Sequence, residues 1–137
     1  MESMMSLGEL KQVPKISDAR GNLSFIQEKD HIPFKIERVF WVYDVPGGEE
    51  RGGHAYRETE EFIVALSGSF DVILDDGKGN VQAIQLNRSY YGLYVPKMVW
   101  RQMSNFSTNS VAMVLASTLY HPEDYIRDYE EFKSLVP

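Results

Sequence analysis

Short runs in which apolar and polar residues alternate occupy most of the chain, and turn-forming residues separate them. Runs of this kind, rich in β-branched and aromatic side chains, predict β-strands. We expect seven strands, at residues 37–44, 60–66, 70–76, 81–86, 92–95, 98–103 and 111–117. Many short strands at regular spacing are typical of a sandwich or barrel, so the pattern predicts an all-β fold.

Two turn sequences predict hairpins. The segment DDGKGN joins the strands expected at 70–76 and 81–86. Earlier, DARGN at 18–22 separates QVPKIS from LSFIQ, and glycine and asparagine in such a position favour a tight turn. We therefore expect a hairpin near the N-terminus.

The hydrophobic period changes only at the C-terminus, in HPEDYIRDYEEFKSL. Here Tyr125, Tyr129, Phe132 and Leu135 recur at steps of three and four, which is the period of a helix. Pro122 suits the first helical position. We expect a short C-terminal helix that begins there.

Composition limits the classes of function. A chain of 137 residues without repeats or linkers is expected to be one domain, residues 1–137. There is no cysteine, no apolar run of about 18 residues and no leader-like N-terminus, so we expect a cytoplasmic protein. A net charge of −6 argues against nucleic acid and anionic membranes as partners. An anionic ligand would need a few well-placed arginines.

The segment from Arg51 to Ser69, RGGHAYRETEEFIVALSGS, has the spacing of the first conserved motif of the cupin superfamily. Residues two apart on a strand point to the same face, so positions 54 and 56 are both expected to face the barrel lumen. The second cupin motif is also present. The matching positions are Gly48, His54, Tyr56, Glu61 (or Glu60) and Gly68 in the first motif, and Pro96, Met98, Arg101 and Asn105 in the second.

Two of the usual cupin metal ligands are replaced. Tyr56 and Arg101 stand where two of three histidines are expected, which leaves His54 and one carboxylate. A guanidinium does not coordinate metal and repels a divalent cation. We expect no metal and no cofactor. The same guanidinium is suited to a carboxylate, a phosphate or a developing oxyanion.

A closer resemblance covers nearly the whole chain. The segments IPFKIERVFWVYD, RGGHAY, GSFDVILDDG, GLYVPKMVWRQM, MVLAS and DYIRDYEEF occur in this order. Together they resemble the sugar-nucleotide 3,4-ketoisomerases, often labelled WxcM-like. The resemblance implies a cupin jelly-roll barrel and a homodimer with N-terminal strand exchange. It also implies an isomerase that moves the keto group of a dTDP-4-keto-6-deoxyhexose between C4 and C3.

The family pattern RGxHAH reads RGGHAY here, so Tyr56 replaces the second histidine. Three explanations stay open: Tyr56 assumes part of the role, the substrate or product stereochemistry differs, or the chain is a non-catalytic sugar-nucleotide-binding cupin. A plain core tyrosine is an equally good interpretation of Tyr56. Glu60 and Glu61 are expected to be a solvated edge and a structural hydrogen-bond partner.

The isomerisation needs a base for the C3 proton and a proton donor for the oxygens. His54 is the natural base because its ordinary pKa lies near neutrality. Tyr56, with an ordinary pKa of about 10, is expected to donate to the C3 and C4 oxygens. Arg101 would stabilise the enediolate.

Four further residues are candidates for substrate binding. Arg51 and Arg20 each lie in a turn-rich RG sequence that a phosphate oxygen could approach, at the diphosphate or the sugar rim. Tyr43 and Tyr94 are candidates to stack on the base or to wall the sugar.

Overall fold

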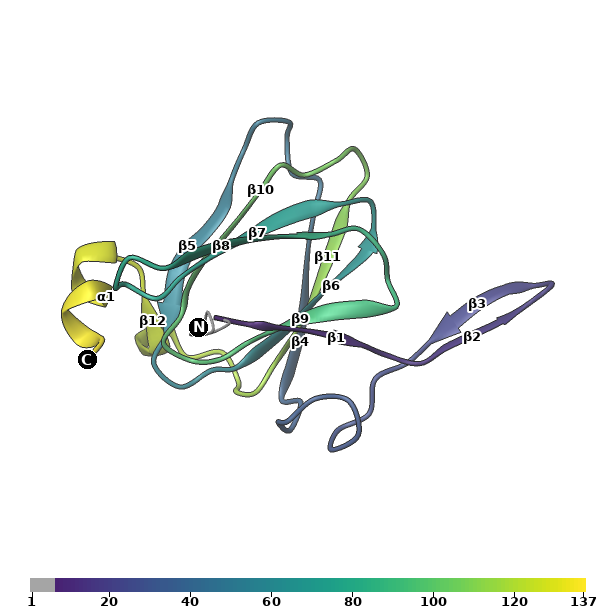
Figure 1. Ribbon diagram of the computed structural model, residues 1–137, viewed down its shortest axis with the longest axis horizontal. Helices are drawn as coiled ribbons and strands as arrows, with labels where there is room; N and C mark the ends of the chain where they lie inside the picture. The colour runs from purple at the N-terminus through teal and green to yellow at the C-terminus, as the bar shows by residue number, and fades with distance from the viewer. Residues whose placement is uncertain (1–6) are drawn as a thin grey trace, which may run out of the picture.

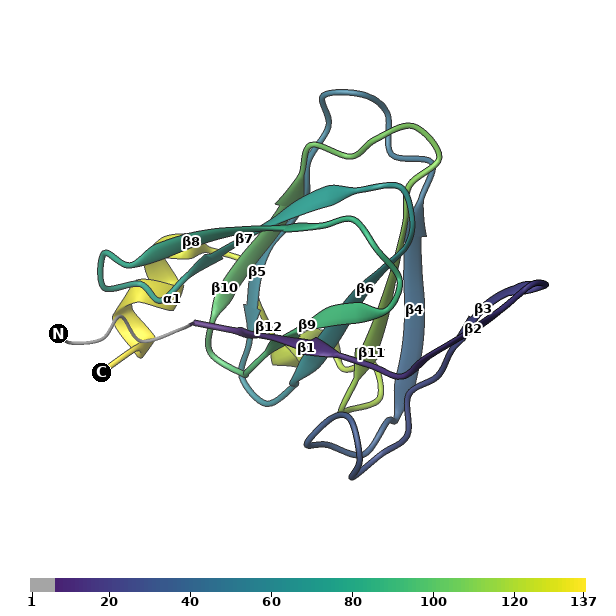
Figure 2. The ribbon, with the colours of Figure 1, turned by 45° about the vertical axis from the view of Figure 1, so that its right-hand side comes forward.

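Two antiparallel β-sheets of five strands each face one another and form the body of the protein (Figure 1, Figure 2). The computed structural model describes residues 7–137, so the first six residues of the expected domain lie outside the described range. One sheet has the order β1-β9-β6-β11-β4 and the other β12-β5-β10-β7-β8. The strands are β1 (Glu9–Gln12), β2 (Lys15–Asp18), β3 (Gly21–Ser24), β4 (Arg38–Tyr43), β5 (Arg51–Tyr56), β6 (Glu61–Ser67), β7 (Phe70–Asp75), β8 (Val81–Leu86), β9 (Tyr91–Val95), β10 (Trp100–Ser104), β11 (Val111–Ala116) and β12 (Tyr125–Ile126).

The core lies between the two sheets, and strand β7 shows how alternation in the sequence builds it. In β7, Phe70, Val72 and Leu74 are buried while the residues between them are only partly covered. They pack with Ile63 of β6 and Leu93 of β9 from the opposite sheet. The period of two places one face of such a strand in the core. Strand β6 differs, because Glu61 to Ala65 are all buried, and β2 and β3 are exposed along their whole length. The predicted all-β jelly roll is confirmed.

All seven predicted strands are present, and their ends differ from the prediction by at most two residues. The N-terminal hairpin is also confirmed as β2 and β3, although Pro14 divides the segment that was expected to form its first strand. Residues before the proline form β1, which pairs with β9 at the edge of a sheet. Proline has no N–H for a strand ladder, which explains the division.

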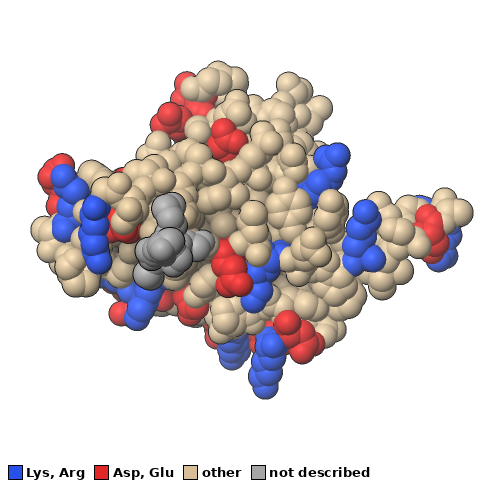
Figure 3. Space-filling view, viewed as in Figure 1, with Lys and Arg blue, Asp and Glu red and all other residues tan. Residues whose placement is uncertain are grey.

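The hairpin of β2 and β3 projects from the body, at the right of Figure 1. In Figure 3 it stands clear of the other surface, with charged side chains at its tip. Ile16 and Leu23 on its strands are more than half exposed. Trp41 and Tyr43 on the edge strand β4 are each 58% exposed. The described chain therefore carries uncovered apolar surface on both the hairpin and β4.

The C-terminal segment differs from the prediction of a helix that begins at Pro122. Residues Pro122–Asp124 form one 3₁₀ turn, Tyr125–Ile126 form β12, and helix α1 spans Tyr129–Leu135. The Asp124 carboxylate accepts hydrogen bonds from the Glu58 N–H at 2.7 Å and from the Thr59 hydroxyl, which holds the turn against the β5–β6 connection.

Strand β12 then pairs with β5, Tyr125 opposite Tyr56. The real helix begins later, because Asp128 caps it by accepting from the N–H groups of Glu130 and Glu131. Helix α1 covers the outer side of β5, where Phe132 packs with Trp100 and Ile126. No helix among residues 7–137 is long and apolar enough to cross a membrane.

Candidate active site

A cavity of about 430 Å³ lies between the sheets, and Tyr125 and Arg127 of the C-terminal segment contribute to its lining. Strands β4 and β11 supply an apolar wall, while β5, β6, β10 and the residues around β12 supply most of the polar groups. The lining residues are Phe40, Val42, Glu50, Arg51, Gly52, His54, Tyr56, Glu61, Ile63, Arg101, Met103, Val114, Tyr125 and Arg127. An apolar wall opposite convergent polar groups is typical of a small-molecule site.

Strand β5 directs His54 and Tyr56 into this cavity, as expected from their spacing. Ala55 between them points to the other side and is fully buried against Ile126. The imidazole and phenol rings meet edge to face, with centroids 4.8 Å apart. Packing on both sides of β5 fixes the two rings relative to each other.

His54 is held neutral. Burial lowers the pKa of its imidazole to about 3, and the positive charges of Arg101 and Arg127 add to the effect. The buried Nε2 atom has no hydrogen-bond partner among residues 7–137. A buried polar atom without a partner is uncommon and points to a group that a ligand completes. A neutral imidazole at physiological pH can accept a proton without first losing one.

Tyr56 is held protonated. Burial raises the pKa of its hydroxyl far above the ordinary value, with further contributions from the negative charge of Glu61 and a hydrogen bond to Tyr125. The Tyr56 hydroxyl donates to the Tyr125 hydroxyl at 3.4 Å. The phenol therefore serves as a hydrogen-bond donor rather than as a base.

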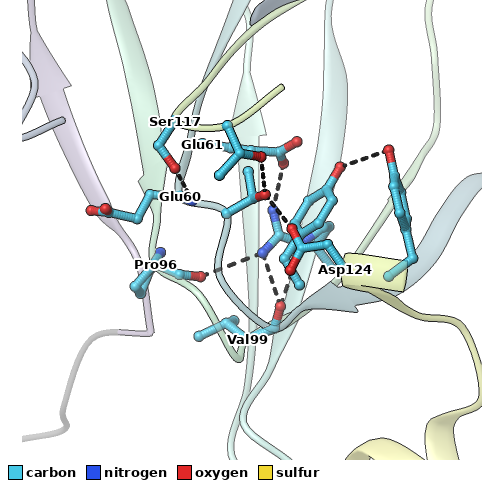
Figure 4. A network of polar contacts seen from close by, with 11 residues as sticks. Glu60, Glu61, Pro96, Val99, Ser117 and Asp124 are labelled. Carbon is cyan, nitrogen blue, oxygen red and sulfur yellow. Dashed lines mark hydrogen bonds and ion pairs between the residues drawn. The ribbon is translucent and has the colours of Figure 1, made fainter. Parts of the chain in front are cut away.

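Arg101 forms a buried ion pair with Glu61. The Nη1–Oε1 distance is 2.5 Å, and the two side chains are 2% and 4% exposed. The remaining nitrogens donate to the carbonyl oxygens of Val99, at 3.0 and 3.3 Å, and Pro96, at 3.4 Å (Figure 4). All three guanidinium nitrogens are thus engaged by the protein. The anionic partner that a buried arginine requires is supplied internally.

The four cupin ligand positions, 54, 56, 61 and 101, all line the cavity. They do not form a ligand set, because residues 7–137 contain no group of three or more histidine, aspartate or glutamate side chains that could hold a metal ion. Glu61 Oε2 is buried and has no hydrogen-bond partner within this range. This oxygen is open to a ligand hydroxyl.

The other predicted binding residues are dispersed. Arg51 lines the cavity, but as the first residue of β5 rather than in a turn. Tyr43 is exposed on β4 and Arg20 lies in the hairpin turn, where it pairs with Asp18 at 2.7 Å. Tyr94 faces away from the cavity, packs near Phe34, and donates to Glu60 at 2.6 Å. Within one chain, only Arg51 of these four reaches the cavity.

Sequence reasoning missed Tyr125 and Arg127. Tyr125 lies opposite Tyr56 in the ladder of β12 and β5, and its ring centroid is 5.2 Å from that of His54. The Arg127 guanidinium lies 4.3 Å from the centroid of the Tyr125 ring. Both residues were assigned to a helix, and the sequence gives no local signal that this segment returns to the barrel.

Comparison with known proteins identifies the family. The profile described as "FdtA: WxcM-like, C-terminal" matches residues 7–137. The chain belongs to this family. A curated relative from Aneurinibacillus thermoaerophilus, TDP-4-oxo-6-deoxy-alpha-D-glucose-3,4-oxoisomerase, is 48% identical over 122 residues, which cover 89% of this chain and 87% of the relative.

Solved structures agree with this assignment. A 3,4-ketoisomerase from Helicobacter canadensis is 38% identical with a TM-score of 0.90, over 93% of this chain and 96% of the other. A mutant of the 3,4-ketoisomerase QdtA from Thermoanaerobacterium thermosaccharolyticum, in complex with TDP-4-keto-6-deoxyglucose, is 33% identical with a TM-score of 0.92, over 96% and 94%. The WlaRB TDP-quinovose 3,4-ketoisomerase from Campylobacter jejuni is 39% identical with a TM-score of 0.89, over 95% and 99%.

As a member of the FdtA/WxcM-like family, this chain departs from the expected RGxHAH pattern at Tyr56. The structure surrounds that phenol with His54, Tyr125 and Arg101, whose guanidinium lies 5.0 Å from the centroid of the Tyr56 ring. A second tyrosine therefore stands beside the substituted position. The substitution replaces an imidazole by a phenol, so this wall of the cavity still carries polar groups.

Proposed function

We propose that this chain is a sugar-nucleotide 3,4-ketoisomerase, which moves the keto group between C4 and C3 of a dTDP-linked 6-deoxyhexose. The observation that carries the proposal is the neutral imidazole of His54, whose Nε2 has no partner among the described residues and which lines a cavity of about 430 Å³. The names of the curated relative and of the similar solved structures support the same reaction.

In the proposed reaction, His54 removes the C3 hydrogen as a proton and later delivers a proton to C4. Between these steps the sugar is an enediol, and one proton passes from the C3 oxygen to the C4 oxygen. Glu61 Oε2 is placed to accept a hydrogen bond from a sugar hydroxyl. The Arg101 charge is balanced by Glu61, so its contribution to an enediolate is smaller than that of a free guanidinium.

Substrate binding is proposed to involve both chains of a homodimer with exchanged N-terminal strands. Arg51 is the candidate for the diphosphate, since it is exposed and lines the cavity. Arg20, Tyr43 and Tyr94 would contact substrate only from a partner chain or at the cavity rim. The exposed apolar residues of the hairpin and β4 support the dimer, because such surface is usually covered.

We also propose that residues 1–137 form one cupin domain. The cytoplasm is the proposed compartment, in agreement with a cysteine-free sequence.

The direct test is incubation with dTDP-4-keto-6-deoxyglucose, followed by NMR to detect migration of the carbonyl from C4 to C3. Conversion to a 3-keto sugar supports the isomerase. Binding of the sugar nucleotide without conversion would instead identify a non-catalytic binding protein, the alternative that Tyr56 suggested.

We also expect the reaction to need no metal, because the Arg101–Glu61 pair occupies two of the four cupin ligand positions. Activity should be unchanged after chelator treatment, and elemental analysis should find no stoichiometric transition metal. About one zinc, iron or manganese per chain, with activity lost to the chelator, would contradict this expectation.

A further inference from the structure

Tyr125 is the cavity-lining tyrosine that lies outside β5 and outside the two cupin motifs. Strand β12 places it directly opposite Tyr56. Its ring contacts both site rings, with centroids 4.8 Å from Tyr56 and 5.2 Å from His54. The three rings form one cluster. Within it, Tyr125 is partly exposed, whereas Tyr56 is buried.

The direction of the hydrogen bond between the tyrosines distinguishes their roles. Tyr56 donates its hydroxyl hydrogen to the Tyr125 oxygen. A phenol hydroxyl has one hydrogen to donate, so the Tyr56 hydroxyl cannot donate a second hydrogen bond to a ligand. Among residues 7–137, no group accepts the hydrogen of the Tyr125 hydroxyl, which leaves that hydrogen for a ligand in the cavity.

The surrounding charges also favour Tyr125 as the site of a transient phenolate. The Arg127 guanidinium lies 4.3 Å from its ring centroid and has no carboxylate within 4.0 Å in the described chain. The positive charge of Arg101, near Tyr56, is balanced by Glu61. Negative charge on Tyr56 would be repelled by that same carboxylate.

We propose that Tyr125 is the catalytic acid and base for the two sugar oxygens, and that Tyr56 is a positioning residue that acts through it; this inference rests on the ketoisomerase function proposed above. When His54 takes the C3 proton, the C3–H electron pair forms the C3–C4 double bond. The C4 carbonyl pair moves onto its oxygen, which takes the proton of Tyr125. The enediol and a Tyr125 phenolate result.

The second half reverses the roles of the two carbons. The Tyr125 phenolate takes the proton of the C3 hydroxyl, and the C3 carbonyl forms. The electron pair of the double bond then takes the proton from His54 at C4. Both residues return to their starting states and no other reactant is needed. The Tyr56 hydroxyl and Arg127 stabilise the phenolate between the two halves.

The test compares single hydroxyl deletions in the full chain with dTDP-4-keto-6-deoxyglucose. Tyr125→Phe keeps the ring and should lower kcat by roughly 100-fold, with KM and TDP affinity nearly unchanged. Tyr120→Phe is the matched control, because this exposed tyrosine also contacts the Tyr125 ring, at 5.9 Å, but does not line the cavity. It should retain the wild-type rate.

A double variant separates catalysis from packing. If Tyr56 acts only through Tyr125, then Tyr56→Phe combined with Tyr125→Phe should be no slower than Tyr125→Phe alone. Additive losses would overturn the assignment of Tyr56. Arg127→Gln, at an exposed position, should lower kcat in the wild-type background and have no effect in the Tyr125→Phe background.

The outcomes distinguish this inference from the function on which it rests. An active wild type together with a fully active Tyr125→Phe overturns the role of Tyr125 alone. A wild type that converts no substrate overturns the ketoisomerase proposal and this inference together. If Tyr125→Phe fails to bind TDP, the kcat of Arg127→Gln becomes the test of the role of Tyr125. A lowered kcat in that variant supports the inference, and an unchanged kcat counts against it.

Discussion

At the scale of single residues, the environment of His54 determines what its imidazole can do. An exposed histidine has a pKa near 6.5 and is half protonated in mildly acidic solution. Burial and two neighbouring arginines keep His54 unprotonated down to about pH 3. The arginines of this cavity therefore act on the base as well as on any anionic ligand.

The first prediction concerns His54→Asn. The amide retains polarity but cannot accept the C3 proton, so we expect kcat to fall at least about 100-fold, the range of general acid and base catalysis. Carbonyl migration followed by NMR measures the rate, and calorimetry with TDP measures binding. Turnover equal to that of the wild type would show that another group removes the proton.

The sequence predicted the part of the site that belongs to the two cupin motifs, on β5, β6 and β10. His54 and Tyr56 share a face because their separation is two residues, and Arg101 joins them through the ladder of β10 and β5. Tyr125 was not predictable, because its position depends on a pairing between segments far apart in the chain. Tyr43 and Tyr94 were chosen from residue type, which does not specify the face of a sheet that a side chain occupies. Arg20 was chosen from its turn sequence and lies in a turn, and its role in binding stays a prediction.

At the scale of elements, the C-terminal segment shows how side-chain hydrogen bonds divide a helical pattern. Its apolar residues have the period of a helix, but Asp124 binds the β5–β6 connection and Asp128 begins a new helix. The two residues of β12 between them complete the sheet beside β5. A periodic pattern indicates which residues face the interior, but it does not specify the backbone conformation. In this segment a short strand and a helix share the apolar residues that the pattern assigned to one helix.

The second prediction concerns Phe132, the buried anchor of α1. Phe132→Ala leaves a cavity beside Trp100 and should lower the free energy of unfolding by about 3 to 5 kcal/mol. Because α1 supports β12, kcat should also fall while TDP affinity changes less. Denaturant unfolding and steady-state kinetics measure the two effects. Leu135→Ala on the exposed part of the same helix is the control and should change little.

At the scale of the whole molecule, the third prediction concerns assembly. Removal of residues 1–28 takes away β1 and the hairpin, and should abolish the proposed dimer together with most of the stability. Trp41→Ser tests the β4 surface separately and should weaken the dimer, whereas Val81→Ser at a similarly exposed position on β8 should not. Light scattering at micromolar concentration is the measurement. A well-folded monomer, intact or truncated, would count against the dimer.

The fourth prediction is a loss of stability in mild acid. Unfolded His54 binds a proton near pH 6.5, whereas folded His54 does so only near pH 3. Between these values the unfolded state binds more protons, so the free energy of unfolding falls as the pH falls. From pH 7 to pH 5.5 the loss should be roughly 1 kcal/mol. Denaturant titrations at fixed protein concentration measure it, and His54→Asn should remove this part of the slope.

Strand β12 also has a consequence for biosynthesis. The strands that carry His54, Tyr56 and Arg101 all leave the ribosome before the segment that holds Tyr125 and Arg127. While the chain is being translated, one wall of the cavity is missing and the outer side of β5, with Trp100 beneath it, has no helix to cover it. A nascent chain from which β12 has not yet emerged therefore lacks the part of the cavity wall that Tyr125 and Arg127 supply.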